Sequence, residues 1–71
     1  MFATDNDISR CESLLKNILS KRGVNLDNNS IDKIVRKVLA IIYAKGGDYR
    51  DEILKDYIEM YLDDNPIQTT D

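Results

Sequence analysis

The sequence predicts an all-α fold, a small three-helix bundle that associates as a homodimer. Apolar residues recur at helical spacing in three segments, and connections containing Asn, Asp or Gly separate these segments. The chain has 71 residues, one Cys and no His, so neither an internal disulfide nor a zinc site of Cys and His ligands can stabilise it. We therefore expect one helical domain over 1–71, with helices at about 7–22, 30–45 and 48–63 and a loose tail at 65–71.

The first helix is expected to begin within the polar run at 4–7, where each residue is a possible N-cap. One face carries six apolar residues at helical spacing: Ile8, Cys11, Leu14, Leu15, Ile18 and Leu19. Lys21 and Arg22 suit the negative end of the helix dipole, and Gly23 suits the position just past the helix end.

The second helix is the most apolar segment, and we expect it to be the central one. Ser30 or Asn29 is the expected cap. Its β-branched residues would also fit a strand, but the length of the run, its helical spacing and the following Gly46-Gly47 favour a helix. The third helix is expected to start at Asp48 as N-cap and to end before Pro66.

The apolar faces of the second and third helices are broader than a compact bundle needs. A contiguous apolar patch left on a surface usually marks an interface, and two-fold dimers are the commonest oligomers. We therefore predict self-association through Ile41, Ile42, Leu54 and Ile58. The alternative is that the connections and the N-terminal residues cover these faces within one chain.

The sequence offers little catalytic chemistry. Without His, Cys11 lacks the usual activating base, and its place on an apolar helix face is typical of a buried thiol. A calcium loop starting at Asp5 fails, because its sixth and twelfth positions hold Arg10 and Lys16. We therefore predict that the chain is not an enzyme and has no catalytic residue, cofactor or metal site.

Charge is divided along the chain. Residues 21–45 carry six Lys or Arg against two Asp, whereas residues 46–71 carry eight Asp or Glu against two Lys or Arg. In the third helix, acids alternate with tyrosines, which are common in binding hot spots, and acidic rows steer association with basic partners. The predicted partner-binding residues are Tyr49, Asp51, Glu52, Asp56, Tyr57, Glu59 and Tyr61.

The leading function is thus a non-enzymatic protein-interaction module, a small acidic regulator or inhibitor that binds a host protein through the third helix. Small acidic helical proteins of this kind resemble, by analogy only, phage or mobile-element products that block a host machine. One alternative is a nucleic-acid-associated protein that uses Lys33, Arg36 and Lys37, which lie at i, i+3, i+4. Another is a structural homodimer without a separate target.

No feature of the sequence predicts export or membrane insertion. Residues 1–10 lack a basic start followed by an apolar run, so we expect no secretory signal. No apolar stretch approaches the roughly 18–20 residues that span a bilayer. We expect a cytoplasmic protein with a protein partner.

Overall fold

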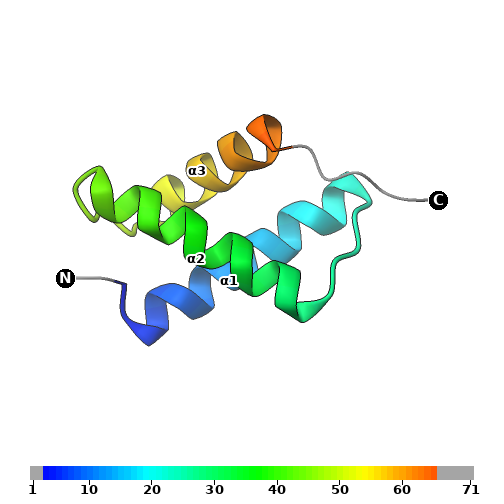
Figure 1. The fold of residues 1–71 in the computed structure, drawn as a ribbon, viewed down its shortest axis with the longest axis horizontal. Coiled ribbons are helices and arrows are strands. Elements are labelled where there is room, and N and C mark those ends of the chain that lie inside the picture. The colour runs from blue at the N-terminus through cyan, green and yellow to red at the C-terminus, as the bar shows by residue number, and fades with distance from the viewer. Residues whose placement is uncertain (1–2, 66–71) are drawn as a thin grey trace.

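The computed structural model describes residues 3–65, which contain three α-helices and no strand. The helices are α1 (Asp5–Arg22), α2 (Asn28–Ala44) and α3 (Asp51–Asp64). In Figure 1, α1 and α3 run in the same direction. The helix between them in the chain, α2, runs in the opposite direction. The predicted all-α, three-helix fold is confirmed, whereas the homodimer stays a prediction.

α1 starts two residues earlier than predicted because Thr4 forms a capping box. The Thr4 hydroxyl accepts the backbone N–H of Asp7 at 3.2 Å, and the Asp7 carboxylate accepts the backbone N–H of Thr4 at 3.0 Å. The pKa of the Asp7 carboxyl is lowered, first by this backbone N–H. Gly23 ends the helix in the left-handed region with φ of 71°, as the sequence predicts.

α2 starts at Asn28 because its cap is Asp27 and not Asn29 or Ser30. The Asp27 carboxylate accepts the backbone N–H of Ser30 at 3.0 Å, which places the two predicted caps inside the first turn. The helix ends at Ala44, close to the predicted boundary.

α3 starts three residues later than predicted. Gly46 and Gly47 both have positive φ, 127° and 74°, and Arg50 is the extended N-cap residue from which the helix begins. Asp48 does not cap the helix, because its carboxylate accepts the backbone N–H of Arg50 at 3.2 Å and pairs with the Arg50 guanidinium. Tyr49 therefore lies in the connection.

Asn65 caps the C-terminal end of α3, although it was predicted to lie in the loose tail. Its backbone N–H donates to the Tyr61 carbonyl at 2.9 Å, and its side-chain amide donates to the same oxygen at 3.0 Å. Residues 66–71, the rest of that predicted tail, lie outside the described residues.

The core is apolar, with no buried polar or charged side chain among residues 3–65. All three helices contribute to it: Cys11, Leu15, Ile18, Leu19, Ile31, Ile34, Val35, Val38, Leu39, Ile42, Leu54, Ile58 and Leu62. Burial raises the pKa of the Cys11 thiol to about 11, so this thiol is protonated at neutral pH.

α2 was expected to be the central helix, but α1 has the most contact with the other two. α2 contributes more buried residues than either neighbour, but α1 packs closely on both α2 and α3, and those two pack least on each other. Two ion pairs join α1 to α3, Arg10 with Asp51 and Arg22 with Asp63. Both pairs span 41 residues of sequence, as expected of helices that run parallel in one register. The α2–α3 seam therefore has the least helix–helix contact of the three.

Candidate partner-binding surface

α3 presents three side-chain rows with different surroundings. Its inner row, Leu54, Ile58 and Leu62, is buried in the core. At 3.6 residues per turn, the positions just before these residues form a neighbouring row, Ile53, Tyr57 and Tyr61, and the next positions form an outer row: Glu52, Asp56, Met60 and Asp64. Two tyrosines therefore lie at the edge of the core. The outer row combines acidic side chains with Met60.

A shallow groove lies along the α2–α3 seam. Its lining residues, which we call the α2–α3 groove, are mostly apolar: Ile41, Tyr57, Met60, Tyr61, Asp64 and Asn65. The groove has a volume of about 240 Å³. Tyr57 and Tyr61 pack against the core, while Ile41 and Met60 stay 39% and 50% exposed. The groove is therefore a surface hollow whose exposed walls are aliphatic side chains.

The acidic charge of α3 is only partly neutralised within the protein. The helix carries six carboxylates and one Lys. Asp51 and Asp63 pair with arginines of α1 at 2.5 and 3.2 Å. The other four have no cation within ion-pair distance in the described part of the chain: Glu52, Asp56, Glu59 and Asp64.

The predicted partner-binding residues therefore fall into separate groups. Tyr57 and Tyr61 line the groove, and Asp56 lies one turn before Met60 on its outer row. Asp51 is held by Arg10. Glu52 lies one turn before Asp56 on the same outer row, and only Glu59 lies on the flank of α3 away from the groove.

Tyr49 is not part of this surface. It packs against the core, and its hydroxyl is buried without a hydrogen-bond partner among residues 3–65. Burial is the first cause of its raised pKa. A hydroxyl turned into the protein is not placed to contact a partner.

The predicted self-association residues are mostly core residues of one chain. Ile42, Leu54 and Ile58 are at most 1% exposed, so none of them reaches the surface in this fold. Only Ile41 does, and it lines the groove. The broad apolar faces are thus largely covered within one chain, because α1 packs on both helices that carry them.

Three groove residues were absent from the predicted site: Met60, Asp64 and Asn65. Met60 was recognisable as apolar, and its i, i+4 spacing to Asp56 and Asp64 is visible in the sequence. The missing information was the position of Ile41, which depends on how α2 and α3 pack.

The predicted basic face of α2 is exposed and partly neutralised. Arg36 pairs with Asp32 at 2.8 Å, and this hydrogen-bonded pair raises the pKa of the guanidinium. Lys33 and Lys37 have no carboxylate within ion-pair distance in the described residues. They precede Ile41 by two turns and one turn on the same row.

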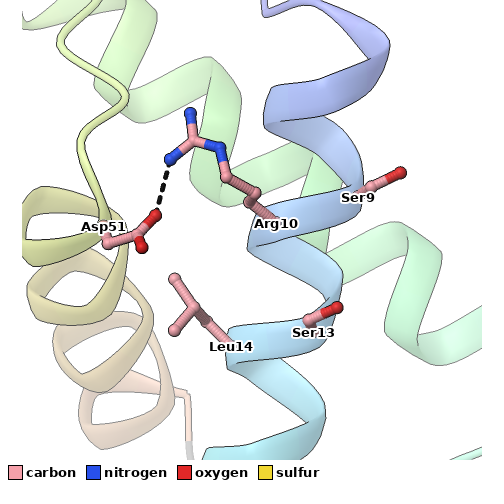
Figure 2. Close-up of a pocket in the computed structure, with 5 residues that line it drawn as sticks. All are labelled: Ser9, Arg10, Ser13, Leu14 and Asp51. Atoms are coloured by element: carbon pink, nitrogen blue, oxygen red, sulfur yellow. Dashed lines mark hydrogen bonds and ion pairs between the residues drawn. The ribbon is translucent and has the colours of Figure 1, made fainter.

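A second hollow, of about 250 Å³, lies between α1 and the start of α3. Figure 2 shows Arg10 and Leu14 reaching toward α3, where Arg10 meets Asp51, while the hydroxyls of Ser9 and Ser13 point away from that ion pair. Arg10 also pairs with Asp7. Its charge is balanced on two sides, and neither hydroxyl faces a base, so this hollow has no arrangement for acid–base chemistry.

Among residues 3–65, no three Cys, Asp or Glu side chains gather as a metal-binding group. None of the three described helices has the length and apolar character needed to cross a membrane. Comparison with protein-family models, curated proteins and solved structures finds no match to this chain.

Proposed function

We propose that this chain is a non-enzymatic protein-interaction module, a small acidic regulator or inhibitor that binds a protein partner through α3. One observation carries the proposal: exposed apolar groove residues adjoin carboxylates that no cation of the described chain neutralises. Apolar anchors beside tyrosines supply binding energy, and unpaired charge at the rim supplies orientation and association rate.

The exposed side chains of this surface would supply a modest binding energy. Full burial of an Ile or Met side chain contributes about 1.5–3 kcal/mol. Ile41 and Met60 have about half of their surface left to bury, so each adds about 1 kcal/mol on binding. Contacts to Tyr57 and Tyr61 add to this, since tyrosines at the centre of an interface cost about 2 kcal/mol or more on truncation.

The test reverses charge on either flank of α3. Asp64→Lys changes the groove flank, and Glu59→Lys is the matched control, since neither carboxylate has an ion pair in the described residues and Glu59 lies on the flank away from the groove. Tagged proteins capture partners from cells of the source, and the affinity of each purified partner is then measured by titration calorimetry. We expect the groove-flank variant alone to lose binding while its circular dichroism stays that of the wild type.

Wild-type affinity in both variants would show that the carboxylates of α3 do not contribute to binding. Loss only in the control variant would move the binding surface to the opposite flank of α3. Loss in both, with folding intact, would indicate a general electrostatic attraction and no defined site.

A second candidate function, nucleic-acid association, is favoured by one observation: Lys33 and Lys37 are exposed and lack a carboxylate partner in the described residues. With Arg36 they would contact about three phosphates, which predicts a slope near −3 for log affinity against log salt. Lys33→Glu with Lys37→Glu should then abolish a gel shift at low salt. A wild-type protein that shifts neither duplex nor single-stranded probes at low salt would dispose of this candidate.

A further inference from the structure

We propose that the α2–α3 groove binds a short amphipathic helix of basic character, with an apolar side chain of that helix seated between Ile41 and Met60. This inference rests on the proposed function and specifies the chemistry of the partner. Three properties of the groove carry it: the kind of side chain it exposes, the elements that form it, and the charge along its banks.

The exposed part of the groove is aliphatic. Tyr57 and Tyr61 pack against the core, so Ile41 and Met60 present the most exposed large side chains of the lining. Aliphatic walls around a hollow of about 240 Å³ suit a Leu, Ile or Met anchor. Met is also a side chain that adapts its shape to an entering partner.

The elements that form the groove favour a helical ligand. The described residues contain no strand, so they offer no sheet edge to which an extended peptide could add. The groove instead lies between two antiparallel neighbours, α2 and α3, which pack on each other less than either packs on α1. A helix laid along this seam would fill it as the ridges of one helix fill the grooves of another.

Charge on the two banks selects a basic ligand and its orientation. The outer row of α3 places Asp56 and Asp64 one turn on either side of Met60, and neither has an ion pair in the described chain. On α2, Lys33 and Lys37 lie on the row of Ile41. The basic flank of a docked helix would therefore lie along α3, and a neutral or acidic flank would lie along α2.

The probe is a synthetic helical peptide with Leu at i, i+3, i+4 and i+7, Lys elsewhere, and one Trp on the apolar face. The protein contains no Trp, so indole fluorescence reports the peptide alone. One control peptide has the same composition with the apolar stripe scrambled, and another has Glu in place of Lys. We expect the striped basic peptide to bind at least about tenfold more tightly than either control.

Two variants locate the binding site. Met60→Lys places a cation in the groove, and Tyr43→Lys is its matched control, since Tyr43 is similarly exposed at 48% and does not line the groove. We expect Met60→Lys to weaken the striped peptide about tenfold and Tyr43→Lys to change its affinity by less than about threefold. Circular dichroism checks that both variants stay folded.

Equal binding of striped and scrambled peptides, or equal weakening by the two variants, would overturn the inference. So would a dimer seen by light scattering that Met60→Lys converts to monomer, because the occupant of the groove would then be a second copy. Failure of every peptide to bind, with binding of a captured partner still lost in Asp64→Lys, rejects the helical ligand and keeps the proposed function. Site-specific peptide binding with no captured partner rejects the proposed function and keeps the groove as a site for a basic helix.

Discussion

Replacing Ile58 by Val tests whether the apolar face of α3 completes one chain or joins two. Ile58 is fully buried in the core, whereas the sequence pattern predicted it at a dimer interface. Ile41→Val is the matched control, since it removes the same methylene from a side chain that is 39% exposed. Both substitutions keep a β-branched residue in a helix, so helix propensity changes little.

The expected magnitudes follow from burial. Removing one buried methylene costs about 0.8 kcal/mol in transfer free energy, and the small cavity left behind brings Ile58→Val to about 1 kcal/mol. A loss of that size lowers the melting temperature of a domain of this length by about 4–8 °C. Ile41→Val leaves no cavity, and its cost should stay below about 0.5 kcal/mol.

The assay is thermal unfolding followed by circular dichroism over a wide range of protein concentration. We expect the same melting temperature at every concentration, with the shift confined to Ile58→Val. A melting temperature that rises with concentration would show that unfolding is coupled to dissociation. Equal shifts for the two variants would refute the placement of Ile58 in a core that one chain completes.

Four further outcomes follow from the structure. Thr4→Ala should cost about 1 kcal/mol in urea unfolding, because it removes the side-chain half of the capping box; an unchanged midpoint would contradict this. Because folding lowers the pKa of Asp7 from its ordinary 3.8, its contribution to stability is present above that pH and is lost as the pH falls through the lower folded value. Asp7→Asn should therefore flatten the acid limb of a stability–pH curve, and an unaltered limb would exclude this role. Cys11 should react with a thiol reagent only through opening of the core, so Ile58→Val should speed labelling about fivefold; rapid labelling of the native protein would refute its burial. Gly46→Ala should cost about 1–3 kcal/mol because φ is 127° there and no neighbour contacts the added Cβ, and a neutral result would argue against this turn geometry.

Helix number and type could be predicted from the sequence because they depend on local spacing. The central residues of each periodic apolar face are buried in the core, from Cys11 and Leu15 in α1 to Leu54 and Ile58 in α3. Helix starts were less accurate, because several Asp, Asn, Ser and Thr residues can cap and only three-dimensional geometry selects one. Asp48 illustrates the difficulty, since its carboxylate binds Arg50 in the connection instead of starting α3.

The candidate site was predictable in part. Tyrosines and acids of α3 were visible in the sequence, but which acids stay unpaired depends on contacts between residues far apart in the chain. Asp51 and Asp63 meet Arg10 and Arg22 across 41 residues, and no local pattern reveals such a pair. The role of Ile41 likewise depends on packing, because it becomes a groove wall only when α2 lies beside α3.

The two flanks of α3 therefore have different physical roles. Its α1 flank is fixed at both ends by ion pairs whose carboxylates are about two-thirds exposed, so each contributes about 0.2–1 kcal/mol and both weaken in salt. Its α2 flank has no ion pair to α2 within residues 3–65, and core side chains of both helices pack along that seam. The proposed docking of a further helix uses the α2 side of α3, which has no such ion pair to α2 in the described residues. This difference in ion pairing favours the groove, and not the most acidic stretch of α3, as the surface to test for partner binding.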